Sequence, residues 1–132
     1  MAKPKYNGYK IAPDTLKEVA KLGYTPKINR ILRFAEFLKR KYNISKKLEI
    51  ELRKDVGAFN GGLYIDNKII IYENIKLPTL LHELRHWIQF NTRISKELHT
   101  YELREIDARM WSSSILCKVY PEEFKKENYK FY

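Results

Sequence analysis

Cysteine is almost absent from this chain. Its 132 residues include only Cys117, which excludes an internal disulfide framework and indicates a reducing compartment. Cys117 lies in the apolar run 115–117, so we expect a buried core thiol rather than a nucleophile or a metal ligand.

Long hydrophobic runs are missing as well. The longest apolar stretches, such as residues 69–72, are far too short for a membrane-spanning helix, and residues 1–6 lack the apolar segment of a secretion signal. We therefore expect a cytoplasmic protein without a membrane partner.

Acidic residues are outnumbered by basic ones, 16 to 26, which gives a net charge of +10. Such an excess favours contact with nucleic acids or acidic substrates through long-range attraction. The lysines are nevertheless spread along the whole chain, with short basic clusters at 39–41, 46–47 and 125–126, and no nucleic-acid-binding module is recognisable. Nucleic acid is therefore only a minor candidate partner.

Composition and periodicity predict one α+β domain over residues 1–132, with a short, mostly antiparallel sheet. Hydrophobic residues make up 44% of the chain, enough for a modest core, and no linker or repeat divides it. The first half is expected to contain a basic arm (1–12), a helix at 16–22 ended by Gly23, and a longer helix after Pro26. Strands are expected at 48–53 and 56–59, followed by a hairpin of 63–65 and 68–72 around Asp66-Asn67. The second half is expected to contain a helix at 79–91, a polar loop at 92–99, a helix from a Thr100 cap to Val119, and a tail at 121–132.

The five residues His82-Glu83-Leu84-Arg85-His86 spell H-E-x-x-H and use two of the three histidines of the chain. In a helix, His82 and His86 lie one turn apart on the same face, where two imidazoles suit adjacent corners of a tetrahedral zinc site. Glu83 flanks that face and is placed to take a proton from a water. The motif therefore predicts a zinc hydrolase.

The alternative interpretation of the motif is a surface helix with a solvated histidine pair. The flanking sequence argues against it, because Leu81, Leu84 and Ile88 recur at helical spacing and form an apolar stripe. The histidines and Glu83 fall beside that stripe, as in a helix that lines a cleft.

Two histidines bind zinc weakly, so a third ligand must come from elsewhere in the chain. His99 has the wrong spacing for the H-E-x-x-H-x-x-G-x-x-H pattern, which needs a glycine at Gln89 and a histidine at Thr92. Carboxylates on the last predicted helix are better candidates: Glu102, Glu105 and Asp107. The alternative for all three is a charged helix face with pairs such as Glu105–Arg109.

A glutamate on a following helix, some twenty residues after the second histidine, resembles the pattern of gluzincin metallopeptidases. The run Glu105-Ile106-Asp107-Ala108, with Trp111 beyond it, is similar to the variant in small single-domain members: the minigluzincins, the regulatory peptidases of the ImmA/IrrE type, and related catalytic cores. The similarity covers about residues 48–118 and implies a zincin-like domain, with an active-site helix and a C-terminal glutamate helix.

The resemblance implies that His82, His86 and Glu105 bind one catalytic Zn²⁺ and that Glu83 is the general base; Glu102 is the second choice for the third ligand and Asp107 the third. One position departs from the pattern. Many gluzincins have Asp or Asn four residues after the ligand glutamate to orient a histidine, whereas this chain has Arg109, which cannot accept a hydrogen bond. Either Asp107 or a backbone carbonyl then orients the histidine, or the metal site is weakened.

The predicted activity is a zinc-dependent endopeptidase that cleaves a peptide held along an edge strand. Tyr101 is the predicted oxyanion donor, with Tyr64 and His99 as alternatives. The resemblance also implies latency imposed by flanking segments, here the N-terminal arm or the tail. The competing hypotheses are a non-hydrolytic regulator that binds a protein or DNA and, less favoured, a metal-free structural domain.

Overall fold

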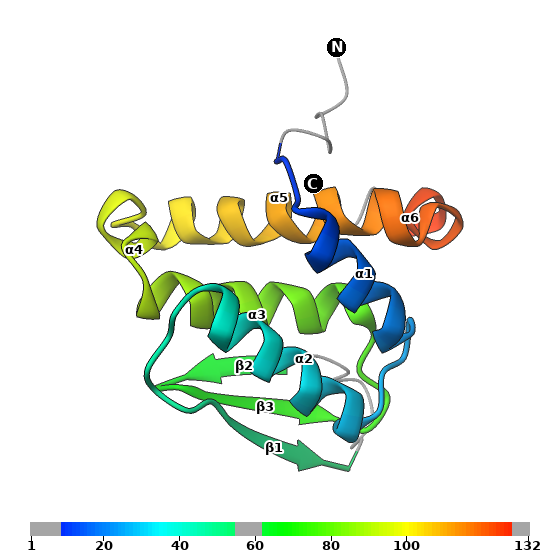
Figure 1. Ribbon diagram of the computed structural model, residues 1–132, viewed down its shortest axis with the longest axis horizontal. Helices are drawn as coiled ribbons and strands as arrows, with labels where there is room; N and C mark the ends of the chain where they lie inside the picture. The colour runs from blue at the N-terminus through cyan, green and yellow to red at the C-terminus, as the bar shows by residue number, and fades with distance from the viewer. Residues whose placement is uncertain (1–8, 55–61, 128–132) are drawn as a thin grey trace.

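The computed structural model describes residues 9–54 and 62–127 of the chain. The fold is α+β, as predicted, with a small three-stranded sheet, two N-terminal helices and a pair of long antiparallel helices (Figure 1). In the order of the chain the elements are α1 (Pro13–Leu22), α2 (Ile28–Lys41), β1 (Glu49–Arg53), β2 (Gly62–Ile65), β3 (Lys68–Tyr72), α3 (Leu77–Asn91), α4 (Ile94–Glu97), α5 (Tyr101–Val119) and α6 (Pro121–Glu127).

The first N-terminal helix ends where the sequence predicts. Pro13 occupies the first turn of α1, where its missing N–H costs nothing, so this helix begins three residues earlier than expected. Gly23 ends it with a φ of 85°, a left-handed value that favours glycine. The apolar sides of α1 and α2 are buried, with Val19, Leu22 and Leu38 at their centre.

The sheet has the strand order β1-β3-β2, with β3 in the middle. The hairpin of β2 and β3 is confirmed. Asp66 and Asn67 have φ values of 50° and 62°, the left-handed pair that a two-residue type I′ turn needs. The prediction of a mostly antiparallel sheet is wrong, because β1 pairs with β3 in parallel and the sheet is mixed. The chain reverses between β1 and β2 and again at Asp66-Asn67, so β1 and β3 run the same way. The strand expected at 56–59 lies outside the described residues.

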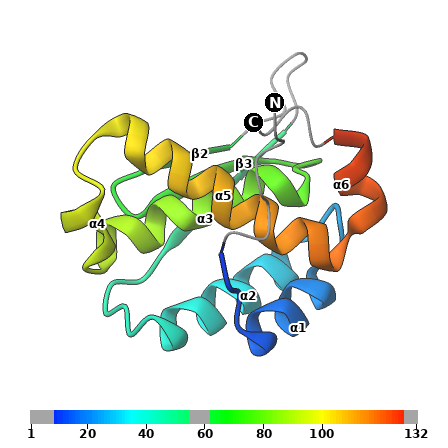
Figure 2. The ribbon, with the colours of Figure 1, turned by 90° about the horizontal axis from the view of Figure 1, so that it is seen from above.

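The long helices α3 and α5 lie side by side and run in opposite directions, with α4 at the turn between them (Figures 1 and 2). The stripe predicted on α3 is fully buried, including Leu81, Leu84 and Ile88. Thr100 caps α5 as expected, since its hydroxyl accepts a hydrogen bond from the backbone N–H of Leu103. The interface between the two helices thus fixes which residues of α3 face which residues of α5.

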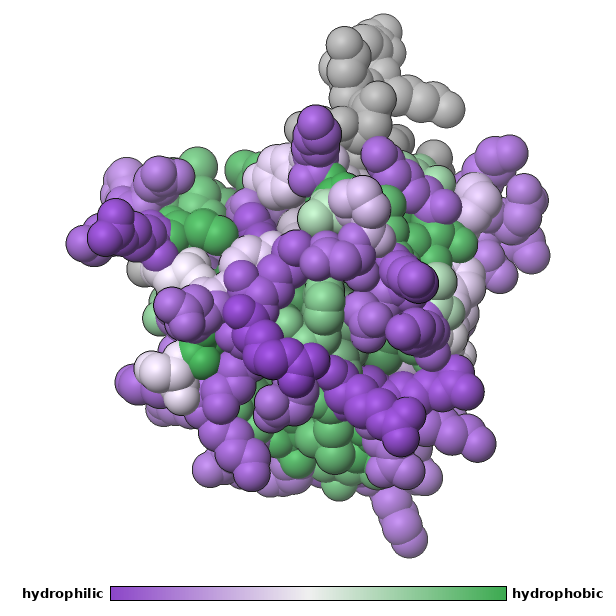
Figure 3. All heavy atoms as spheres, viewed as in Figure 1, coloured by the Kyte–Doolittle hydropathy of each residue, from purple (hydrophilic) through white to green (hydrophobic). Residues whose placement is uncertain are grey.

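Two segments predicted as irregular contain helices. The loop 92–99 includes the single turn of α4, and α6 begins at Pro121, directly after α5 ends. Phe124 of α6 packs against the hydrophobic core, so the first half of the predicted tail is part of the folded domain. Polar residues cover most of the face seen in Figure 3, with smaller hydrophobic areas between them. Among the described helices, none is both long and apolar enough to cross a membrane.

Candidate metal centre

Helix α3 presents His82, Glu83 and His86 beside its buried stripe, and α5 brings Glu105 to the same place. The Nε2 atom of His82 lies 3.2 Å and 3.4 Å from the two carboxylate oxygens of Glu105. The Nε2 atom of His86 lies 2.6 Å from Oε2 of Glu105 and 3.1 Å from Nε2 of His82. The two histidines and the carboxylate therefore converge on one point.

This triad, defined as His82, His86 and Glu105, could hold a metal ion. Its ligand atoms all lie within 4.8 Å of one another, and it is the one such group found in residues 9–54 and 62–127. Ligands at about 2.0–2.1 Å from a tetrahedral Zn²⁺ are about 3.3 Å apart, close to most of the distances within the triad. Two nitrogens and one carboxylate also match the ligand set of catalytic zinc sites. The residues present fit a Zn²⁺ ion.

The lowered pKa of His82 suits metal binding. Burial lowers the pKa of His82, and the neighbouring His86 lowers it further, while Glu105 opposes both effects. A neutral imidazole has a free lone pair, which is the form that binds a metal.

Gln89 orients His86, a role that the sequence analysis assigned to Asp107 or a backbone carbonyl. The side-chain oxygen of Gln89 lies 2.9 Å from Nδ1 of His86, so Nδ1 carries the proton and Nε2 remains free for a metal. The amide of Gln89 donates to the carboxylate of Asp107 at 2.8 Å and to the backbone oxygen of Arg104 at 2.9 Å. These two bonds fix which end of the amide faces the histidine.

Asp107 takes part in this network without facing the triad. It accepts hydrogen bonds from Arg85 at 2.8 Å and 3.2 Å, from Gln89, and from the hydroxyl of Tyr9 at 2.7 Å. Burial alone would raise the pKa of Asp107, but these donors outweigh it and hold the pKa below its usual value. A carboxylate so fully engaged is not available as a third ligand.

Glu83 lies beside the triad in the same pocket and has a raised pKa. Burial and the nearby negative charge of Glu105 raise its pKa to about 7, although the backbone N–H of Tyr64 donates to the carboxylate and opposes the rise. A carboxyl group with a pKa near neutrality can both accept and return a proton under physiological conditions.

A pocket of about 310 Å³ opens over the triad, and a smaller one of about 200 Å³ adjoins it. Both are lined by His82 and Glu83. The larger pocket extends to the edge strand β2 and to the start of α5, and its other lining residues are Tyr64, His86, Phe90, Tyr101, Arg104 and Glu105. The smaller pocket is lined in addition by Pro78, Thr79, Arg109 and Ser112.

The predicted oxyanion donors lie at different places. Tyr101 is at the rim of the larger pocket and is 67% exposed. Tyr64 also lines this pocket, but its hydroxyl is engaged at the hairpin turn, where it bonds to the side chain and the backbone N–H of Asn67. His99 is exposed and does not line either pocket. Tyr101 and Tyr64 thus line the larger pocket, and of these two the Tyr64 hydroxyl is engaged by Asn67.

The remaining candidates are also placed. Glu102, the second choice for the third ligand, is exposed and lies outside the triad. The alternative pair between Glu105 and Arg109 is not formed in the described part of the chain, because Glu105 turns to the histidines.

Gln89 and Arg104 were not singled out from the sequence. The available signal for Gln89 was its place three residues after His86, on the same helix face.

Comparison with known proteins adds no assignment: no protein-family model, no curated protein and no solved structure matches the chain.

Proposed function

We propose that the protein is a zinc-dependent endopeptidase with a zincin-like domain of the gluzincin type. The observation that carries the proposal is the convergence of His82, His86 and Glu105, with Gln89 holding Nδ1 of His86 and leaving Nε2 free. A bare H-E-x-x-H match lacks this third ligand and this orienting hydrogen bond.

Glu83 would carry the proton in this reaction. Zinc supplies Lewis-acid chemistry at such a site, since it lowers the pKa of a water and polarises a carbonyl oxygen. The carboxylate of Glu83 accepts the proton from the attacking water and passes it to the amine that leaves. A pKa near 7 suits both steps, and burial of the side chain keeps it near this value.

The edge strand β2 offers a track for an extended substrate. Among the described strands it pairs with β3 alone, and the larger pocket lies between this strand and helix α3. An extended peptide can add to such an edge through main-chain hydrogen bonds, and these bonds do not depend on the sequence of the peptide. Tyr101 at the pocket rim is the proposed donor to the oxyanion, because its side chain is exposed and free to turn toward a substrate.

The test of this proposal combines metal analysis with hydrolysis of casein. We expect the full chain to contain about one equivalent of zinc and to cleave casein, and Glu83→Gln to keep the metal while losing activity. Glu105→Ala should lose both, whereas Glu102→Ala, an exposed carboxylate of the same helix, should lose neither. Zinc retained in full by Glu105→Ala, or hydrolysis by Glu83→Gln at the wild-type rate, would refute the assignment.

The second candidate function is a non-hydrolytic regulator that uses the same fold to bind a protein or DNA. The net charge of +10 favours it, because such a charge attracts nucleic acids. This alternative predicts salt-dependent DNA binding that Glu83→Gln leaves intact, together with no cleavage of casein in the presence of zinc.

Latency through the flanking segments remains a proposal. The segments proposed to enter the cleft are the N-terminal arm (1–12) and the tail (121–132), of which residues 1–8 and 128–132 lie outside the described part of the chain. Removal of residues 128–132 alone is the appropriate test, because a cut before Pro121 would also remove Phe124 from the core. A faster cleavage of casein after this truncation would support latency, and an unchanged rate would assign no such role to these five residues.

A further inference from the structure

Two arginines of α5 lie on either side of the ligand Glu105 and point to the class of substrate. Arg104 lines the larger pocket and Arg109 lines the smaller one, while both pockets share His82 and Glu83. A substrate that passes over Glu83 would therefore meet one guanidinium on each side of the reacting bond.

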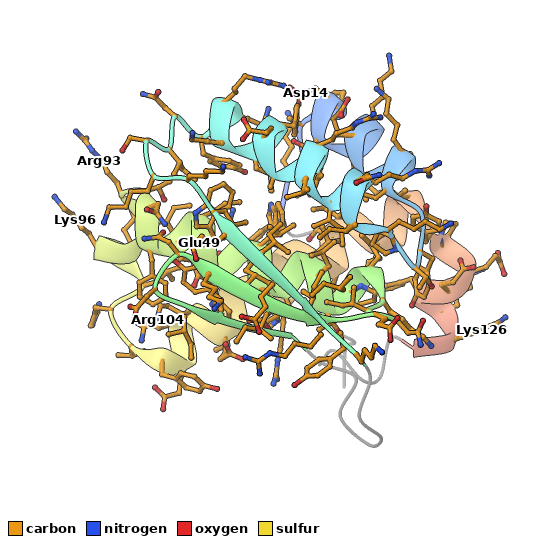
Figure 4. The ribbon with its side chains drawn as sticks, turned by 90° about the horizontal axis from the view of Figure 1, so that it is seen from below. Asp14, Glu49, Arg93, Lys96, Arg104 and Lys126 are labelled. Carbon is orange, nitrogen blue, oxygen red and sulfur yellow. The ribbon has the colours of Figure 1, made fainter. Side chains whose placement is uncertain are left out.

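Arg104 is held in position before any substrate binds. It is half-buried, one of its nitrogens donates to the backbone oxygen of Leu98 at 3.2 Å, and its guanidinium lies 5.1 Å from the centre of the Phe90 ring. Figure 4 shows it near the α4 end of α5, whereas Arg93 and Lys96 project outward beyond the same end. A guanidinium fixed in this way loses little conformational freedom when it binds a carboxylate.

Neither arginine is neutralised within the described part of the chain. The ion pairs there involve other residues, and Glu105, which could pair with Arg109 one turn along the helix, contacts the histidines instead. Arg109 is exposed, yet close enough to His82 for its positive charge to lower the pKa of that histidine. Two unpaired cations next to a cleft favour a ligand that brings negative charge.

The spacing of the two arginines fits an extended peptide. Five residues of α-helix span about 7.5 Å, and consecutive residues of a strand are about 3.3 Å apart, so the arginines are separated by roughly two substrate positions. Two residues of an extended peptide that are two positions apart have their side chains on the same face, so such a pair, with the cleaved bond between its members, lies within reach of the two arginines.

We propose that this cleft selects acidic peptides, with Arg104 and Arg109 each binding the carboxylate of a Glu or Asp side chain, one on either side of the cleaved bond. This inference rests on the proposed peptidase function, and it adds the substrate class. The net charge of +10 would act in the same direction by drawing acidic segments toward the protein.

The experiment uses the zinc-loaded full chain and internally quenched peptides blocked at both ends, so that no terminal carboxylate is present. Glu, Gln or Lys is placed at the first or second position before or after the cleaved bond. Cleavage is measured as kcat/KM, and binding of the same peptides to Glu83→Gln is measured by fluorescence anisotropy. We expect Glu to be preferred over Gln by about tenfold on each side, with Lys weaker than Gln, and the preference to fall as salt is added.

The variants separate the two sides. Arg104→Gln should abolish the preference for Glu on one side and Arg109→Gln on the other, while Arg104→Lys should retain part of it. Arg93→Gln is the matched control, because it removes the same charge from an exposed position outside both pockets and should change nothing. Thermal unfolding of each variant checks that the fold is kept.

Equal cleavage and equal binding of Glu and Lys peptides would overturn the proposal, as would Arg104→Gln or Arg109→Gln variants that keep the preference as fully as Arg93→Gln. If a preference appears only for peptides with a free C-terminal carboxylate, the proposed side-chain recognition is also wrong. Arginine-dependent binding of Glu peptides to Glu83→Gln, without cleavage by the wild type, would support the acidic cleft and refute the peptidase function.

Discussion

Two clusters of polar residues lie side by side between α3 and α5, and they differ in how their charges are balanced. The triad faces the pocket of about 310 Å³, and its closest contacts join two imidazoles and a carboxylate to one another. The second cluster, Arg85, Gln89 and Asp107, faces a separate pocket of about 630 Å³ lined by the N-terminal segment and Trp111. There the guanidinium and the carboxylate are paired, and Tyr9 and Gln89 complete the hydrogen bonds of Asp107.

The comparison shows how one helix, α3, contributes residues both to a structural cluster and to the candidate metal site. Both pairs on α3, His82 with His86 and Arg85 with Gln89, are four residues apart, so they form neighbouring rows on the helix surface. Arg85 and Gln89 both donate hydrogen bonds to Asp107, and this network stabilises the fold. The histidine row brings two imidazoles to the carboxylate of Glu105, which forms no ion pair with an arginine or lysine in the described residues, and a bound cation would balance its charge.

The largest expected effect is the loss of stability when the second cluster, Arg85, Gln89 and Asp107, is broken; we call it the balanced cluster because its charges are paired. Asp107→Ala leaves the charge of Arg85 buried and unpaired, and we expect it to lower the free energy of unfolding by about 3–5 kcal/mol, measured by urea denaturation. Glu105→Ala in the metal-free protein should cost much less, because it relieves crowding at the triad. Equal losses for the two variants would remove the contrast between the clusters.

Zinc should stabilise the protein through the triad alone. At a free zinc concentration of a hundred times Kd, the gain in the free energy of unfolding is about 2.7 kcal/mol. This gain should vanish in His86→Ala and Glu105→Ala and persist in Glu102→Ala. Identical thermal unfolding of the zinc-loaded and chelator-treated wild type would show that the triad does not bind the ion.

Glu83, which lies beside the triad, and Asp107 of the second cluster should respond to pH in opposite directions in the metal-free protein. The pKa of Glu83 is raised from 4.5 to about 7, so the folded state holds a proton that the unfolded state has lost, and stability decreases as pH rises through this window. We expect a loss of roughly 2 kcal/mol between these values, absent in Glu83→Gln. The pKa of Asp107 is lowered from 3.8, so its contribution is present above that pH and is lost as pH falls below it.

Helix ends and the hairpin turn were predictable from single residues in the sequence. The helix ends follow from Pro13, Gly23 and the Thr100 cap, and the hairpin follows from Asp66-Asn67, because each of these residues acts on its own backbone. The pairing of β1 with β3 was not predictable in this way, since it depends on contacts between segments distant in the sequence.

The same limit applies to the site. The spacing of His82 and His86 specified one helix face, but the choice among Glu102, Glu105 and Asp107 depended on how α5 packs against α3. That packing turns Glu105 to the histidines, buries Asp107 against Arg85 and leaves Glu102 in solvent. Gln89 was missed because a glutamine has no distinctive pattern, and its function depends on partners on both helices.

Gln89 joins the two clusters, and its substitution should give the smallest effect of this series. Gln89→Ala removes the acceptor that holds Nδ1 of His86, and we expect zinc affinity to fall about tenfold, or about 1.4 kcal/mol, in a titration against a competing chelator. The effect should lie at the low end of the usual range because a neutral amide is a weaker acceptor than a carboxylate. Asn91→Ala is the matched control, since it removes hydrogen bonds from the same helix without touching a histidine. If both variants bind zinc equally well, the balanced cluster does not support the triad, and the two regions are independent neighbours.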